Sequence, residues 1–175
     1  MRIYILKNET KNKSSWINDL KMILVRDYGL KQNDLEFSEN QYGKPYLINN
    51  KVYFNVSHSG KLVVIAISKE EVGVDIEIIQ SRKYRDEIVL RTFNEKEKEI
   101  YEEHKNIDYF YEVWTKKEAY VKLIGTGITD MFKTLPIYYD KVIVSRKIKV
   151  LDDDYYLSLA TKNNNERNNI ELKYE

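Results

Sequence analysis

The chain has 175 residues, with 29 Lys and Arg against 28 Asp and Glu and a formal net charge of +1 at pH 7. This length suits one compact domain or two small halves that share a core, and the near-zero charge gives no global attraction to nucleic acid or to a membrane surface. Cysteine is absent and histidine occurs twice, which excludes disulfides, thiolate chemistry and Cys-ligated zinc. Carboxylates and lysines must therefore carry any chemistry.

The beginning of the chain contains no export signal. The apolar run over residues 2–6 is too short for a signal peptide and has no small-residue cleavage pattern. No stretch of 18 apolar residues occurs, so no transmembrane helix is predicted. We therefore expect a soluble, cytoplasmic protein that binds neither membrane nor nucleic acid.

The first part of the chain predicts a strand, a helix and further strands. A strand is expected over residues 2–6, and apolar residues at helical spacing predict an amphipathic helix over 15–28. Residues 42–45, Tyr-Gly-Lys-Pro, are typical of a turn. Strands are expected over 52–54 and 62–67, the second apolar on both faces like a central strand.

The next strand, residues 73–78, alternates strictly. Asp75 and Glu77 project from one side, because side chains alternate along a strand. Two such carboxylates can share a hard cation such as Mg²⁺. A strand with a polar outer face is the commonest kind and also explains these two carboxylates without a metal. Gly73 by itself adds little.

Helical spacing dominates the following segment. Helices are expected over 85–92, over 94–104 with Asn94 and Glu97 in a capping box, and over 108–124. The remaining expectations are short strands from 134 to 160 with a turn at 152–154, a loop around 163–165 and an edge strand at 170–172. This order predicts an α+β fold of two similar halves, residues 1–71 and 72–175, with a cleft where they meet.

The helix over 108–124 carries three charged residues at its apolar arc. Lys117 lies inside the arc, and Glu118 and Lys122 lie one turn apart at its edge. Lys117 can simply extend its ammonium group to water, and the other two can form an ordinary ion pair. The functional alternative is a carboxylate and two ammonium groups that face a metal-bound polyphosphate.

Two turns in the first half offer phosphate contacts. Residues 57–60, Ser-His-Ser-Gly, supply hydroxyls, backbone N–H groups and an imidazole between two strands, which suits a phosphate as well as it suits an idle surface loop. Lys44 beside Pro45 is either a second phosphate contact or a solvated turn lysine. The three aspartates at 152–154 lack the spacing of a calcium-binding loop.

Five segments resemble, in order and spacing, the successive motifs of the 4′-phosphopantetheinyl transferases of the surfactin-synthetase-activating type. They are YGKP at 42–45, FNVSHSG at 54–60, VGVDIE at 72–77, FNEKE at 93–97 and WTKKEAYVKLIGTG at 114–127. The resemblance implies a pseudo-dimeric α+β fold with the active site between the halves. It also implies an enzyme that transfers phosphopantetheine from coenzyme A to a serine of an apo acyl or peptidyl carrier protein and releases adenosine 3′,5′-bisphosphate. Because the two halves of one chain already form the pseudo-dimer, the enzyme is expected to be a monomer.

The resemblance also implies a role for individual residues. Asp75, Glu77 and Glu118 would hold Mg²⁺, Glu118 would be the candidate general base, and Lys122 would contact the phosphates during catalysis. The residues implied to bind coenzyme A are Lys44, Pro45, Ser57, His58, Lys117 and Lys122.

Two departures from the family pattern stand out. No arginine matches the basic residue that the family often supplies from its N-terminal segment, so Lys11 or Lys13 would have to replace it, and the C-terminal part is short. A non-catalytic module that binds a carrier protein or a nucleotide is the alternative function. A Mg²⁺-dependent nuclease would use similar carboxylates, but the chain lacks a basic strip with interleaved aromatic residues.

Overall fold

The computed structural model describes residues 1–8, 15–48, 52–81, 83–127, 130–135, 143–162 and 170–175. Its helices and strands follow one another as β1 (Arg2–Lys7), α1 (Ser15–Tyr28), η1 (Gln32–Asp34), β2 (Phe37–Glu39), β3 (Pro45–Leu47), β4 (Tyr53–Ser59), β5 (Leu62–Ser68), β6 (Val72–Ile78), α2 (Arg85–Thr92), α3 (Glu95–His104), α4 (Ile107–Ile124), η2 (Asp130–Lys133), β7 (Ile143–Val150), β8 (Asp153–Thr161) and β9 (Glu171–Tyr174). None of the helices in these ranges is long and apolar enough to cross a membrane.

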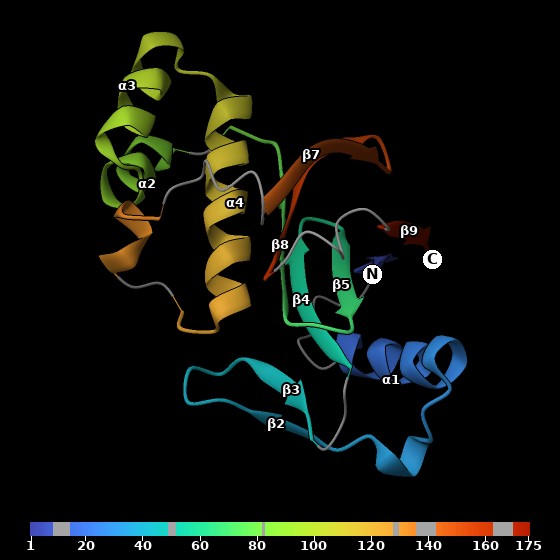
Figure 1. Cartoon of the computed structure of the whole chain (residues 1–175). Helices are drawn as coiled ribbons and strands as arrows, with labels where there is room; N and C mark the ends of the chain where they lie inside the picture. The colour runs from blue at the N-terminus through green and yellow to red at the C-terminus, as the bar shows by residue number, and fades with distance from the viewer. Residues whose placement is uncertain (9–14, 49–51, 82, 128–129, 136–142, 163–169) are drawn as a thin grey trace.

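The first sheet has the strand order β4-β5-β1-β9 and is covered by α1 (Figure 1). Strand β5 is buried along its whole length, as its two-sided apolar sequence predicts. Val63 and Ile65 face the core under α1, and Val64 and Ala66 face the opposite core. Alternate residues of one strand thus hold two layers together.

The second sheet has the order β6-β8-β7, with antiparallel neighbours. One face packs against the first sheet, where Ile5 and Val64 meet Val74, Ile76 and Leu157 in a shared core. The other face carries α4, and α2 and α3 lie on the far side of that helix (Figure 1). The chain is therefore an α+β protein in which α4 and the first sheet lie on opposite faces of the second sheet.

Gly73 allows α4 to pack closely on β6. A Cβ atom at this position would lie 1.9 Å from the carbonyl oxygen of Ala119 and 2.4 Å from the backbone nitrogen of Leu123. Such distances leave no room for any side chain, so the glycine is required by the approach of the helix. Gly73 gives no functional signal in the sequence by itself, but in the fold it allows the polar edge of α4 to lie next to Asp75 and Glu77.

Most elements expected from the sequence are confirmed, including the helix over 15–28, the capping box of Asn94 and Glu97, and the edge strand near the C-terminus. The hairpin of β2 and β3 around the expected turn at 42–45 was missed. The expected loop around 163–165, and the part of the expected short strands over 136–142, lie outside the described residues.

Two expected turns are wrong in detail. Residues 57–59 belong to β4 and pair with β5, so the turn contains only Gly60 and Lys61. The turn expected at 152–154 consists of Leu151 and Asp152, whose positive φ angles of 51° and 67° suit a tight two-residue hairpin. Strand β9 pairs in parallel with β1, so residues 171–174 belong to the same sheet as β1, β4 and β5.

Candidate functional site

Strands β4 and β6 meet along a seam in which side chains replace a backbone ladder. The N–H groups of alternate β6 residues donate to side-chain oxygens of alternate β4 residues: Val74 to Asn55 Oδ1 at 2.8 Å, Ile76 to Ser57 Oγ at 3.3 Å and Ile78 to Ser59 Oγ at 3.0 Å. Buried backbone donors need such partners. The seam thus provides acceptors for the free backbone N–H groups of the edge strand β6, and it aligns the polar faces of β4 and β6.

Asp75 and Glu77 project along this seam, as their alternation predicts. Asp75 is buried, and its Oδ1 accepts hydrogen bonds from Ser57 Oγ at 2.8 Å and Lys122 Nζ at 2.7 Å, whereas its Oδ2 is buried without a hydrogen-bond partner. Glu77 accepts from Ser59 Oγ at 2.8 Å. Burial raises the pKa of Asp75, while the Lys122 ammonium group acts in the opposite direction.

Helix α4 contributes Glu118 and Lys122 from successive turns, which lie on one face of the helix. Burial raises the pKa of Glu118 to about 7; the negative charge of Asp75 and, less strongly, of Glu77 acts in the same direction, while Lys122 opposes them. Three carboxylates and one ammonium group therefore share one electrostatic environment between β6 and α4.

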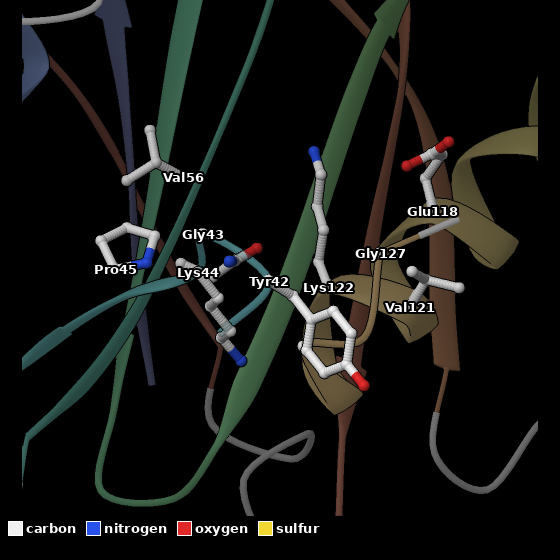
Figure 2. A pocket seen from close by; sticks show the side chains of 11 residues that line it. Tyr42, Gly43, Lys44, Pro45, Val56, Glu118, Val121, Lys122 and Gly127 are labelled. Atoms are coloured by element: carbon white, nitrogen blue, oxygen red, sulfur yellow. The ribbon is translucent and has the colours of Figure 1, made fainter. Parts of the chain in front are cut away.

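A cavity of about 280 Å³ opens beside this group. Figure 2 shows the side chain of Lys122 between Glu118 of the same helix and the residues of the β2–β3 hairpin. The lining residues are Tyr42, Gly43, Lys44, Pro45, Asn55, Val56, Glu118, Val121, Lys122, Gly125 and Gly127. The β2–β3 hairpin and β4 thus form one wall of the cavity, α4 and the residues after it form the other, and two lysines and a carboxylate face it.

The hairpin is fixed to the end of α4 by two side chains. Lys44 Nζ donates to the carbonyl oxygen of Leu123 at 3.0 Å, and Asn40 Nδ2 donates to that of Gly125 at 3.0 Å. Helix C-termini leave carbonyl groups unpaired and favour nearby cations. Lys44 is therefore a helix-capping residue as well as a wall residue of the cavity.

This arrangement matches a known family. Residues 71–164, more than half of the chain, match the model of the 4′-phosphopantetheinyl transferase superfamily. The chain belongs to this superfamily. The match contains β6, α4 and β8, and with them the carboxylates and Lys122.

Curated members of the superfamily are similar over about the same part of the chain. The transferase Sfp of Bacillus subtilis is 32% identical over 114 residues, which cover 63% of this chain and 50% of the relative. The transferase gsp of Aneurinibacillus migulanus is 34% identical over 124 residues, or 66% and 51% of the two chains. The alignments thus span about half the length of these phosphopantetheinyl transferases.

The structure brings several of the residues implied by the resemblance together. Lys44, Pro45, Glu118 and Lys122 line one cavity, and Asp75 joins them through its ion pair with Lys122. These positions agree with a phosphopantetheinyl transferase site at this cavity, and the individual roles stay predictions.

Ser57 and His58 lie on opposite faces of β4. The Ser57 hydroxyl is buried and forms hydrogen bonds with Asp75, Lys122 and the Ile76 N–H, and its contact with the 3′-phosphate stays a prediction. His58 follows on the opposite face of β4, where it is exposed. Its contact with a phosphate stays a prediction.

The predicted phosphate contact of Lys117 does not fit its position in the structure. Its side chain is fully enclosed, and its Nζ lies 2.6 Å from Glu97 Oε2, 2.7 Å from the carbonyl oxygen of Thr92 and 2.8 Å from that of Phe132. These three acceptors saturate the three donors of an ammonium group. Lys117 thus neither contacts the cavity nor extends to water; it ties α2, α3 and η2 to α4.

The carboxylates between β6 and α4 suit a hard divalent cation in their chemistry. Asp75, Glu77 and Glu118 offer oxygen ligands of the preferred type, and Asp75 Oδ2 is a buried acceptor without a hydrogen-bond partner. The three charges also disfavour one another, which a cation would relieve. In the described part of the chain, however, no three His, Cys, Asp or Glu side chains are gathered as a ready-made metal site. The donor chemistry fits, and the Lys122 ammonium group supplies the positive charge in this arrangement.

Sequence reasoning missed the polar partners on β4, because 57–60 was interpreted as a turn. A strand pattern was present: Asn55, Ser57 and Ser59 alternate with Val56 and His58. Extending the strand to residue 59 would have placed all three polar side chains on one face.

Proposed function

We propose that this chain transfers 4′-phosphopantetheine from coenzyme A to a serine of an apo acyl or peptidyl carrier protein and releases adenosine 3′,5′-bisphosphate. The observation that carries the proposal is the position of Lys122: its ammonium group lies 2.7 Å from Asp75 beside a cavity that Glu118 and Lys44 also line. A pyrophosphate needs such positive charge, and a serine nucleophile needs a nearby base.

In this mechanism Glu118 accepts the proton of the carrier serine. Glu118 lines the cavity beside Lys122, so this carboxylate is placed to accept the proton of a nucleophile bound there. The serine oxygen forms a bond to the β-phosphorus, and the bond from that phosphorus to the bridging oxygen of the leaving bisphosphate breaks. Lys122 stabilises the negative charge that grows on the phosphoryl oxygens.

A divalent cation such as Mg²⁺ belongs to the proposal. Asp75, Glu77 and Glu118 would hold it, and it would supply neutralisation of the pyrophosphate charge. Lys122, which pairs with Asp75, would contact the phosphates.

The proposal extends to the architecture. Residues 1–71 and 72–175 would form two similar halves of a pseudo-dimer that acts as a monomer, with the active site at their junction. Supporting this, the hairpin and β4 supply one wall of the cavity and α4 supplies the other. Strand β9 then strengthens the first half by pairing with β1.

Mass spectrometry of carrier proteins tests the function directly. Apo carriers from fatty-acid, polyketide and nonribosomal-peptide synthesis are incubated with the chain, coenzyme A and Mg²⁺, and each is weighed. Gain of the phosphopantetheine mass on at least one carrier is expected, and chelation of the metal should abolish it. Carriers of unchanged mass that nevertheless co-migrate with the chain would support the non-catalytic binding module instead.

A further inference from the structure

Two serines on β4 are matched to two carboxylates on β6. Ser57 Oγ lies 2.8 Å from Asp75 Oδ1, and Ser59 Oγ lies 2.8 Å from Glu77 Oε2. In both pairs the carboxylate lies 18 positions after the serine, so the same contact is repeated two residues further along both strands. A repeated contact of this kind is a property of the register of the seam rather than of one side chain.

The backbone of β6 decides the direction of these hydrogen bonds. Ser57 Oγ accepts from the Ile76 N–H and from Lys122 Nζ, and Ser59 Oγ accepts from the Ile78 N–H. An N–H or ammonium group can only donate, and a hydroxyl has one proton of its own. That proton must therefore go to the carboxylate in both pairs.

The consequence for Asp75 is a fixed orientation. Its Oδ1 is held by Ser57 and Lys122, while its Oδ2 is buried without a hydrogen-bond partner. Holding one oxygen of a carboxylate fixes the plane of the group and so the direction of the other oxygen. The Lys122 side chain retains 28% exposure, whereas Ser57 is buried and its hydroxyl is held by the Ile76 N–H.

We propose that Ser57 and Ser59 are positioning residues, which orient the Asp75 and Glu77 carboxylates to bind the divalent cation of the transfer reaction. The inference rests on the proposed function. It is separate from the contact with the 3′-phosphate of coenzyme A that the family resemblance implies for Ser57. Groups that orient metal ligands typically change metal affinity by 10- to 100-fold when removed.

The test measures Mn²⁺ bound to the chain in the presence of coenzyme A and without carrier, from the electron paramagnetic resonance signal of free Mn²⁺. Ser57→Ala and Ser59→Ala should each weaken Mn²⁺ binding about tenfold or more. Ser57→Thr and Ser59→Thr keep the hydroxyl and should stay within about threefold of the wild type. Unchanged Mn²⁺ affinity in both alanine variants would overturn the inference.

Ser158→Ala is the matched control. Ser158 is buried opposite Asp75 on the neighbouring strand β8, and within the described residues its hydroxyl contacts those of Thr115 and Ser145 and no carboxylate. This variant should lower the melting temperature as the serine variants of β4 do, while its Mn²⁺ affinity stays near that of the wild type. Equal weakening of Mn²⁺ binding in all three alanine variants would show that Ser57 and Ser59 act only through the fold, and would also overturn the inference.

Transfer activity and Mn²⁺ binding of the wild type distinguish a failure of this inference from a failure of the proposed function. If it transfers phosphopantetheine and binds Mn²⁺, only the serine variants decide the positioning role. If it transfers phosphopantetheine but binds no Mn²⁺ with coenzyme A, the cation and the positioning role both fail while the transferase function stands. If it does neither, the proposed function fails as well.

Discussion

Two lysines five positions apart on α4 form ion pairs with buried carboxylates, yet their surroundings differ. Lys117 and its partner Glu97 have no exposed side-chain surface, and the Lys117 ammonium group has two further backbone acceptors. Lys122 is 28% exposed and faces a cavity. Both carboxylate partners, Glu97 and Asp75, keep one buried oxygen without a hydrogen-bond partner, so the difference lies in the surroundings of the two ammonium groups. An enclosed ammonium group with three acceptors suits a structural ion pair, whereas a partly exposed one beside a cavity suits a binding site.

The enclosed pair also organises its neighbourhood. Glu97 Oε2 accepts both the Lys117 ammonium group and the Asn94 N–H, so one carboxylate oxygen serves the ion pair and the capping box of α3. Burial lowers the pKa of Lys117 and raises that of Glu97, and in both residues the partner's charge opposes the effect of burial. Removing one partner therefore leaves a buried charge that nothing else compensates.

Lys117→Met should have the largest effect, and it should act on stability. We expect a loss of about 3–5 kcal/mol in the free energy of unfolding, the scale for removing one partner of a buried ion pair. Urea denaturation measures it. Glu97→Gln combined with Lys117→Met should recover part of the loss, because no unpaired charge then stays buried. A stable Lys117→Met protein would show that Lys117 does not form the structural pair described.

Lys122→Met should lower activity more than stability, the opposite of Lys117→Met. We expect the rate of transfer to fall roughly a hundredfold or more, the scale for losing a preorganised charge-stabilising group. The loss of stability should be smaller than for Lys117→Met, because the Lys122 site is partly exposed and Ser57 still donates to Asp75. The carrier mass assay and the melting temperature together measure both quantities.

Lys116→Met on the same helix is the control for both variants. Lys116 pairs with Glu112 one turn away, on a partly exposed face of α4, and such a pair contributes about 0.3–0.5 kcal/mol. Neither activity nor melting temperature should change appreciably. Equal losses of stability in the Lys117 and Lys122 variants would mean that the two pairs have the same role.

The sequence predicted the local elements well, because their signals are local. Alternation placed Asp75 and Glu77 on one face of β6, and helical spacing placed Glu118 and Lys122 on one edge of α4. The capping box of α3 was likewise readable from Asn94 and Glu97. Each of these inferences needs only the geometry of a single strand or helix.

The partners across elements could not be read in the same way. Nothing in the spacing of Glu97 and Lys117 indicates that α3 and α4 bring them within 2.6 Å. The requirement for glycine at Gly73 likewise arises only from the approach of α4. Long-range packing decides which of two similar lysines is enclosed, and the periodicity of α4 alone placed Lys117 in the apolar arc without identifying the carboxylate that stabilises it there.

Glu118, which lies beside the Lys122–Asp75 pair, should make the stability of the chain depend on pH. The pKa of this carboxyl is raised from 4.5 to about 7 in the folded chain, so its protonated form stabilises the folded state at acid pH. That contribution is lost as the pH rises from about 4.5 to 7, and levels off above. Relative to Glu118→Gln, the wild type should lose on the order of 2 kcal/mol over this interval, as measured by urea denaturation from pH 4.5 to 8.

Mg²⁺ with coenzyme A provides the complementary measurement for Glu118. A bound cation favours the ionised carboxyl and should reduce the difference between wild type and Glu118→Gln at pH 8. If the two proteins keep a constant difference in stability across the whole pH range without metal, Glu118 does not titrate in this interval and the shared electrostatic environment is wrong.

The smallest expected effect concerns His58, which takes part in neither ion pair and whose side chain is exposed near the end of β4. If His58 contacts the 3′-phosphate of coenzyme A, it contributes to binding of the donor and not to the reacting phosphorus. A charge-assisted hydrogen bond is worth about 1.5–3 kcal/mol, so the wild type should prefer coenzyme A over dephospho-coenzyme A by at least about tenfold in kcat/KM. His58→Ala should reduce that preference by weakening the use of coenzyme A, while dephospho-coenzyme A, which lacks the contacted group, is used almost as before. Lys122→Met should depress both donors alike, because the pyrophosphate is common to them. An equal loss for both donors in His58→Ala would assign His58 to the reacting site or to the fold, and would remove it from the recognition of the 3′-phosphate.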